Sequence, residues 1–136
     1  MAIPSLLRFL SVEDVLQIQD DTIGIEGGLR GVRDMGLLES AVMMPQQQFG
    51  GMYLHEGLGA MAAAYLFHLA SNHPFLDGNK RAAAMSALIF LDVNGVADLP
   101  PPEELERVTM AVASSQMDKE TLTTWFREQL GEDTTE

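Results

Sequence analysis

The sequence has no cysteine and few basic residues, and both shortages narrow what the protein can be. Without cysteine, it can form neither a disulfide framework nor a thiolate metal site. Its 8 lysines and arginines stand against 20 aspartates and glutamates, which gives a net charge of −12. A surface this acidic repels the phosphates of nucleic acids, so we expect no direct binding to DNA or RNA. A nucleotide ligand is still compatible with this charge, because a pocket needs only a few local cations.

No segment of the sequence is apolar enough to cross a membrane. The longest uncharged run, residues 57–76, contains His68, Asn72 and His73 and has Pro74 near its end, whereas a span needs about 20 predominantly apolar residues. Residues 1–5 also lack the basic segment and apolar core of a signal peptide. We therefore expect a cytoplasmic protein without membrane association.

The apolar pattern predicts helices along nearly the whole chain. The predicted helices span residues 11–22, 34–42, 54–71, 79–93, 103–114 and 118–130. No segment alternates apolar and polar residues over a strand's length, so we expect no substantial sheet, although a two-strand flap between Pro45 and Tyr53 stays open. The prediction is an all-α fold: a compact single-domain bundle of about six helices over residues 1–130, followed by an acidic, frayed tail at 131–136.

The helices predicted at residues 54–71 and 79–93 differ from the others. They are apolar on most of their faces, which is typical of buried helices. We expect them to pack against each other at the centre of the domain, with their connecting loop exposed at one end. Asn72 suits the left-handed residue that closes the first of the two.

That connecting loop carries most of the chemistry in the sequence. Residues 73–81 read His-Pro-Phe-Leu-Asp-Gly-Asn-Lys-Arg. Such a composition is typical of a loop that grips a polyphosphate at a helix N-terminus beside a proton acceptor. His73 is the natural general base, because imidazole changes its charge near neutral pH; the alternative is a histidine that caps a backbone carbonyl. Lys80 and Arg81 lie in the first helical turn, where the helix dipole disfavours cations, so we expect a bound anion to offset that cost.

Three further residues of the loop have a functional and a structural reading each. A carboxylate beside a phosphate site commonly holds Mg²⁺, so Asp77 is the candidate metal ligand, with helix capping as the alternative. Gly78 lets the backbone approach a ligand closely, with an ordinary turn glycine as the alternative. Asn79 can donate its amide to a phosphate or cap the helix, and the sequence leaves these open. Phe75 should anchor the loop in the core.

These nine residues resemble the signature loop of the Fic/Doc family. Lys80 makes the loop similar to the Doc (death-on-curing) branch, since adenylyl-transferring Fic members usually carry glycine there. Residues 31–41 and 90–95 also resemble the flanking segments of Doc proteins, and the resemblance covers roughly residues 10–127. The chain departs from the pattern at Ser71, where Doc-like members often have a basic residue, and at Ala82, where many have threonine.

The resemblance implies a small all-helical toxin of a toxin–antitoxin module. Its activity would be that of a kinase that moves the γ-phosphate of ATP onto a threonine hydroxyl of translation elongation factor Tu and so blocks translation. By this resemblance His73 activates the acceptor hydroxyl and Asp77 holds Mg²⁺. The nucleotide phosphates are held by Gly78, Asn79, Lys80 and Arg81. His73, Asp77, Lys80 and Arg81 are the expected catalytic residues. Lys80 fills space that a glycine would leave to a phosphate. The nucleotide could therefore bind in the opposite direction and offer a different phosphorus to the acceptor. The alternatives are a Fic-type adenylyltransferase and a catalytically inactive binding module.

The resemblance also implies a partner, an antitoxin segment that binds as a helix in an apolar groove. Met43, Met44 and Met52 could line such a surface, although ordinary core filling is the favoured interpretation of these methionines.

One further match concerns residues 22–27, Thr-Ile-Gly-Ile-Glu-Gly, which fit the (Ser/Thr)-x-x-x-Glu-(Gly/Asn) inhibitory motif of Fic enzymes. In those enzymes the motif is helical. Two glycines and two isoleucines make this stretch a poor helix, so we interpret the match as a coincidence.

Overall fold

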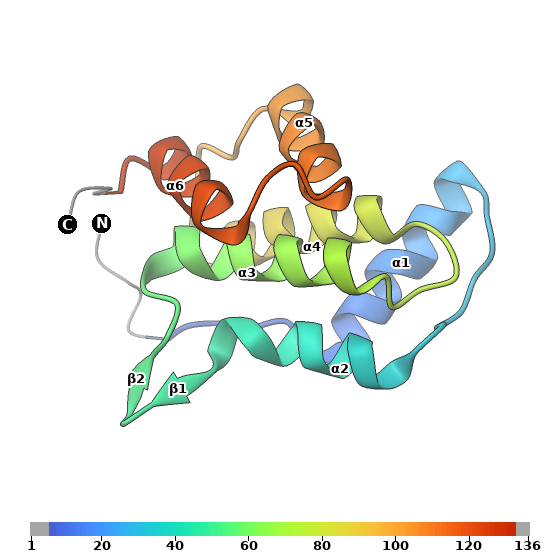
Figure 1. Ribbon diagram of the computed structural model, residues 1–136, viewed down its shortest axis with the longest axis horizontal. Coiled ribbons are helices and arrows are strands. Elements are labelled where there is room, and N and C mark those ends of the chain that lie inside the picture. The colour runs from blue at the N-terminus through green and yellow to red at the C-terminus, as the bar shows by residue number, and fades with distance from the viewer. Residues whose placement is uncertain (1–5, 133–136) are drawn as a thin grey trace.

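Two buried helices, α3 (Gly57–Asn72) and α4 (Asn79–Val93), form the centre of the computed structural model, which describes residues 6–132. Every residue of α3 from 58 to 66 is buried, and its many alanines let neighbouring helices approach closely. Helices α5 (Pro102–Ala113) and α6 (Lys119–Leu130) cover one side of this pair, while α1 (Val12–Glu26) and α2 (Met35–Met43) cover the other (Figure 1). The predicted all-α fold and its buried central pair are therefore confirmed.

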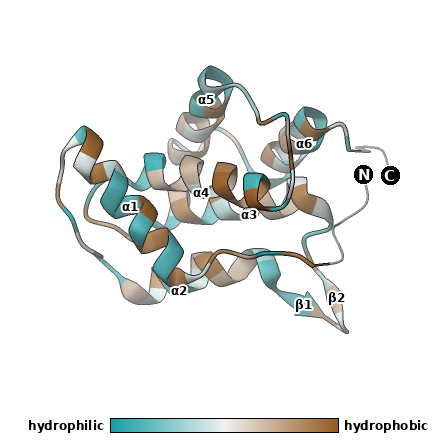
Figure 2. Ribbon diagram, turned by 180° about the vertical axis from the view of Figure 1, so that it is seen from behind, coloured by the Kyte–Doolittle hydropathy of each residue, from teal (hydrophilic) through white to brown (hydrophobic). Residues whose placement is uncertain are grey.

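The outer helices are amphipathic, as expected for elements with one face on the core. In Figure 2 hydrophilic and hydrophobic residues alternate along α1 and α5. The buried residues of α5 include Leu105, Val108 and Val112, which recur at helical spacing. Among the described residues, no helix is both long and apolar enough to cross a bilayer. The predictions for residues 1–5 and 133–136 lie outside the part of the chain that the structure describes.

The predicted end of the first helix is wrong. Helix α1 opens at the expected capping box, in which Ser11 and Asp14 each accept a hydrogen bond from the other's backbone N–H, but it continues through Gly24 to Glu26 instead of ending near residue 22. Tertiary contacts outweigh the low helix propensity, since Thr22 and Ile23 are buried in the last turns. Residues 22–26 are thus helical, and the physical reason for treating the inhibitory-motif match as a coincidence does not hold.

Smaller differences occur at other element ends. Asn72 is the last residue of α3, and His73 takes the left-handed conformation that we expected of Asn72. After α2, a short 3₁₀ helix (Met44–Gln46) leads into a two-strand hairpin, β1 (Gln48–Phe49) and β2 (Met52–Tyr53), which is the flap that the sequence left open. This hairpin projects from one end of the molecule (Figure 1). The core-filling interpretation is wrong for Met43 and Met52, which are 55% and 68% exposed.

The described beginning of the predicted frayed tail is held against the body of the domain. Gly131 closes α6 in the left-handed conformation, and the Glu132 carboxylate accepts a hydrogen bond of 3.2 Å from the Gly59 N–H. An added Cβ at Gly59 would lie 2.6 Å from a Glu132 carboxylate oxygen and 3.2 Å from the backbone nitrogen of Arg127. Helices α3 and α6 are therefore in close contact at Gly59.

The one histidine within α3, His68, lies between the same two helices. The His68 Nε2 is 2.9 Å from the Lys119 Nζ of α6. Burial, together with the Lys119 charge, lowers the pKa of His68 to about 4, so the imidazole is neutral in the folded protein at neutral pH.

Candidate active site

The loop between α3 and α4 is held in place by the segment that follows α1. Residues 27–34 run alongside it: the Arg33 N–H donates to the Pro74 carbonyl at 2.7 Å, and the Leu76 N–H donates to the Gly31 carbonyl at 3.1 Å. Val32 and Phe75 pair as an isolated antiparallel bridge. The Phe75 side chain is buried, as predicted. The backbone of the loop is therefore held by residues 27–34 without any bound ligand.

Arg33 fixes the position of His73. Its Nε donates to the His73 carbonyl at 2.7 Å and its Nη2 to the Asn72 carbonyl at 2.9 Å, which satisfies carbonyls at the end of α3. His73 itself has φ 48° and ψ 55°, a left-handed conformation that costs a residue with a Cβ roughly 1–2 kcal/mol. The backbone of His73 is therefore held in a strained conformation. Its side chain is exposed at the mouth of the site.

Asn79 is committed mainly to the loop itself. Its side-chain oxygen accepts from the Phe75 N–H at 2.9 Å, and its side-chain nitrogen donates to the Phe75 carbonyl at 3.1 Å. One N–H of the amide and the backbone N–H are left for a ligand. Asn79 therefore ties the start of α4 to the backbone of Phe75. A phosphate can be contacted only by the remaining side-chain N–H and the backbone N–H of Asn79.

Asp77 does not cap α4. One of its carboxylate oxygens, Oδ2, accepts from the Leu29 N–H at 2.7 Å, while the N-cap of α4 is Gly78 (φ 76°), which has no side chain to offer. The contact needs glycine at position 28, where a Cβ would lie 3.3 Å from the Asp77 carboxylate and φ is +114°. With no side-chain cap, the first-turn N–H groups of α4 remain available to an anion.

The two cations differ in their surroundings. Both are exposed, and across the described residues Lys80 makes no ion pair or side-chain hydrogen bond. The Arg81 Nη2, in contrast, lies 2.8 Å from a carboxylate oxygen of Glu26, at the end of α1. Glu26 is the acidic residue of the inhibitory-motif match. An anion that binds Arg81 must therefore compete with this carboxylate.

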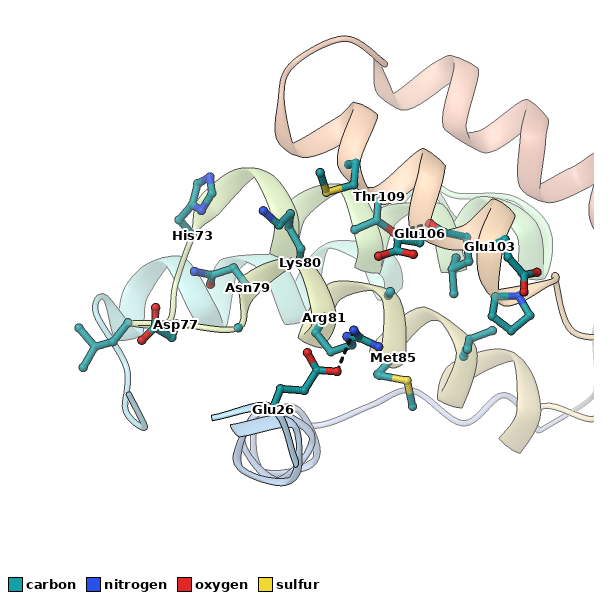
Figure 3. A pocket seen from close by; sticks show the side chains of 17 residues that line it. Glu26, His73, Asp77, Asn79, Lys80, Arg81, Met85, Glu103, Glu106 and Thr109 are labelled. Atoms are coloured by element: carbon teal, nitrogen blue, oxygen red, sulfur yellow. Dashed lines mark hydrogen bonds and ion pairs between the residues drawn. The ribbon is translucent and has the colours of Figure 1, made fainter. Parts of the chain in front are cut away.

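All six predicted residues line one cavity of about 600 Å³, within the size range of small-molecule sites. His73, Asp77, Gly78, Asn79, Lys80 and Arg81 surround one end of it, at the N-terminus of α4 (Figure 3). The cavity continues between α4 and α5, where Met85, Leu88, Glu106 and Met110 contribute to its walls. Ala82 is fully buried and is not part of the lining.

The residues present fit a magnesium ion that is shared with a phosphate. Within residues 6–132, no three histidine or carboxylate side chains come together as a protein-only metal site. Asp77 lines the cavity and keeps Oδ1 uncommitted, because its hydrogen bond to Leu29 uses Oδ2. Mg²⁺ in nucleotide sites commonly takes one or two carboxylates and completes its shell with phosphate oxygens and water. A single carboxylate in this position, that of Asp77, is compatible with such a shared ion.

Sequence reasoning missed two residues of the site. Arg33 and Glu26 lie 40 and 47 positions before His73, so no local spacing could connect them to it. A signal for Glu26 existed in the motif match, and it was set aside because of the glycines around it.

Comparisons with known proteins agree with this arrangement. The Fic/DOC family matches residues 9–91. A protein named Toxin Doc, from Mycolicibacterium smegmatis, is 44% identical over 91 residues, which cover 67% of this chain and 68% of the relative. A protein named Protein kinase doc, from Escherichia phage P1, is 34% identical over 111 residues, which cover 82% of this chain and 86% of the relative. The chain belongs to the Fic/DOC family.

Proposed function

We propose that this protein is a Doc-type toxin: a kinase that transfers the γ-phosphate of ATP to a threonine hydroxyl of elongation factor Tu. The observation that carries the proposal is the single cavity in which a histidine, a carboxylate, two cations and an uncapped helix N-terminus come together. Two relatives, named as a toxin and as a protein kinase, support the same reading.

The chemistry follows from where the groups lie. His73 at the mouth takes the proton of the threonine hydroxyl as that oxygen bonds to the γ-phosphorus. The bond from the γ-phosphorus to its bridging oxygen breaks, and ADP leaves with the electron pair. Lys80, Arg81 and the N–H groups of α4 stabilise the charge on the phosphate oxygens. The rigid backbone of the loop keeps these donors in place during the transfer.

Asp77 would hold Mg²⁺ through Oδ1, and the ion would add positive charge beside the phosphates. The chain's own contribution is to fix the Asp77 carboxylate through the Leu29 N–H, which engages Oδ2 and leaves Oδ1 without a hydrogen bond.

Label transfer tests this function. The purified protein is incubated with Mg²⁺, elongation factor Tu and ATP that carries a radiolabel in either the γ or the α position. We expect label on a threonine from the γ position only. Label from the α position would instead establish adenylyl transfer, and no label from either position would refute this acceptor. In cells, expression should arrest growth and His73→Ala should abolish the arrest, whereas an inactive binding module would arrest growth equally with either histidine or alanine.

We further propose that an antitoxin helix docks in the groove between α1 and α4. This groove, of about 200 Å³, is lined by apolar residues that include Ile18, Ile25, Met85 and Ile89. Ile25 is 85% exposed. Asp21 and Glu26 lie along the same groove, so its charge favours an amphipathic helix with lysine or arginine at its edges. Because Arg81 lines both the groove and the cavity, a bound helix would also touch the nucleotide site.

A pair of variants tests the docking surface. Ile25→Asp should keep growth arrest but abolish rescue by the co-expressed antitoxin. Met52→Asp, on the exposed hairpin at the other end of the molecule, is the matched control and should leave rescue intact. The reverse result would place the antitoxin on the hairpin.

A further inference from the structure

The cavity extends well beyond the residues that the proposed phosphate transfer uses. Along α4 it is lined from Asn79 to Leu88, a distance of about 13 Å at 1.5 Å per residue. The far end lies between α4 and α5. Figure 3 shows Glu106 of α5 and Lys80 of α4 on facing helices, while Arg81 turns toward Glu26 of α1. Phosphate groups held at the loop leave this far end unfilled.

The walls of the far end are mostly apolar. Ala84, Met85 and Leu88 line it from α4, and Leu105 and Met110 line it from α5. Thr109 adds a hydroxyl, but its proton is already donated to the Leu105 carbonyl at 2.7 Å. Glu103 and Glu106 are the remaining polar side chains there. Such a surface accepts a flat, weakly polar group and offers carboxylates to whatever hydroxyl or amine it carries.

Both carboxylates are exposed, and they differ in their local surroundings. Glu103 lies in the first turn of α5, where the helix dipole favours a negative charge. Glu106 lies one turn further, where that effect has faded. In the described part of the chain its carboxylate makes no hydrogen bond or ion pair, whereas its neighbour Glu104 pairs with Arg107 at 2.9 Å outside the cavity.

We infer that the α4–α5 end of the cavity binds the nucleoside part of the nucleotide, and that the Glu106 carboxylate binds the ribose hydroxyls. This inference rests on the proposed kinase function and deepens it. The Glu106 carboxylate accepts hydrogen bonds from the ribose hydroxyls, and the apolar walls from Met85 and Leu88 pack against the base. A carboxylate repels phosphates, so Glu106 also sets the direction of the nucleotide. The polyphosphate lies at Lys80, and its terminal phosphate is the one presented to His73.

A site of this kind distinguishes sugars more strongly than bases. The ribose is recognised by a charged acceptor, and a hydrogen bond to a charged group changes affinity by roughly ten-fold or more. The base meets no uncommitted polar side chain other than the two glutamates, so different bases should bind with similar affinity.

Calorimetric titration of the whole protein with Mg²⁺ and either ATP or 2′,3′-dideoxy-ATP tests this. The wild type should bind ATP about ten-fold more tightly than the dideoxy analogue. Glu106→Ala should bring ATP to the level of the analogue without weakening the analogue. Glu104→Ala, which removes the same charge from the same helix outside the cavity, should keep the ten-fold preference. Thermal melts of both variants check that the fold is intact.

The outcomes separate this inference from the function on which it rests. If the wild type binds ATP and the dideoxy analogue equally, the ribose assignment is overturned while the kinase proposal stands. If Glu106→Ala changes the ratio of ATP to GTP affinity and not the dideoxy ratio, the carboxylate reads the base and the assignment is again overturned. If the wild type binds no nucleotide at all, the proposed function fails as well.

Discussion

The ion pair between Glu26 and Arg81 predicts that this protein holds part of its nucleotide site closed. Arg81 lines the cavity, yet its guanidinium lies 2.8 Å from the Glu26 carboxylate. We expect Glu26→Gln to increase the affinity for ATP. Glutamine keeps the size of the side chain and its hydrogen bond to Arg81, but it removes the charge that competes with a phosphate.

The expected gain can be worked out from the exposure of the pair. The two side chains are 52% and 45% exposed, so the pair itself contributes about 0.2–1 kcal/mol. A phosphate that binds Arg81 also comes close to the carboxylate, and two like charges 4 Å apart in water repel by about 1 kcal/mol. Together these effects amount to about 1–2 kcal/mol, which corresponds to roughly a 5–30-fold lower Kd.

Calorimetric titration with Mg²⁺ and ATP measures this change directly. The matched control is Asp20→Asn, because Asp20 also lies on α1 and pairs with an arginine, Arg30, at similar exposure (59% and 51%) but outside the cavity. The control should leave the Kd unchanged. An unchanged or higher Kd for Glu26→Gln would refute the idea that the carboxylate competes with the nucleotide.

Three further predictions concern the loop and the core. His73→Gly should abolish phosphate transfer and yet raise the free energy of unfolding by roughly 1 kcal/mol, because glycine adopts the left-handed conformation without strain. Urea denaturation measures this change, and a loss of stability would contradict the prediction. Asn79→Ala should lower the free energy of unfolding by roughly 1–3 kcal/mol, since the Phe75 N–H and carbonyl lose their partners. A change below about 0.5 kcal/mol, which is typical of ordinary surface substitutions, would contradict this role of Asn79. His68 is neutral in the folded state and takes up a proton in the unfolded state below pH 6.5, so stability should fall as the pH drops from 6.5 toward 4. His68→Gln should remove that part of the pH dependence, and parallel stability curves for the two proteins would refute the assignment.

The sequence was informative where local chemistry decides the structure. Helix α4 begins at Asn79 and ends at Val93 as predicted, because a glycine precedes it, Asn94-Gly95 follows it, and no β-branched cluster weakens its centre. The loop residues 73–81 were assigned to one site because their kinds and spacing are unusual, and all of them except Pro74 and Phe75 line one cavity.

Sequence reasoning failed where distant contacts decide the structure. The last turns of α1 are helical because Thr22 and Ile23 are buried, although glycine and isoleucine disfavour helix there. Asn79 was weighed as a phosphate ligand or helix cap, but its amide bonds to the backbone of Phe75, a contact that depends on the shape of the whole loop. The α5 wall of the cavity was not foreseen, because nothing in residues 102–110 indicates that this helix faces α4.

The central claim is that the loop between α3 and α4 holds a nucleotide while His73 takes the proton of the acceptor. Single-turnover transfer of the γ-phosphate to elongation factor Tu, measured beside ATP binding on the same samples of wild type and His73→Ala, tests it most directly. We predict ATP affinities within about two-fold of each other, since an exposed side chain that contacts the acceptor contributes little to nucleotide binding, and loss of transfer by at least about 10²-fold in the variant. Transfer at the wild-type rate by His73→Ala would contradict the claim.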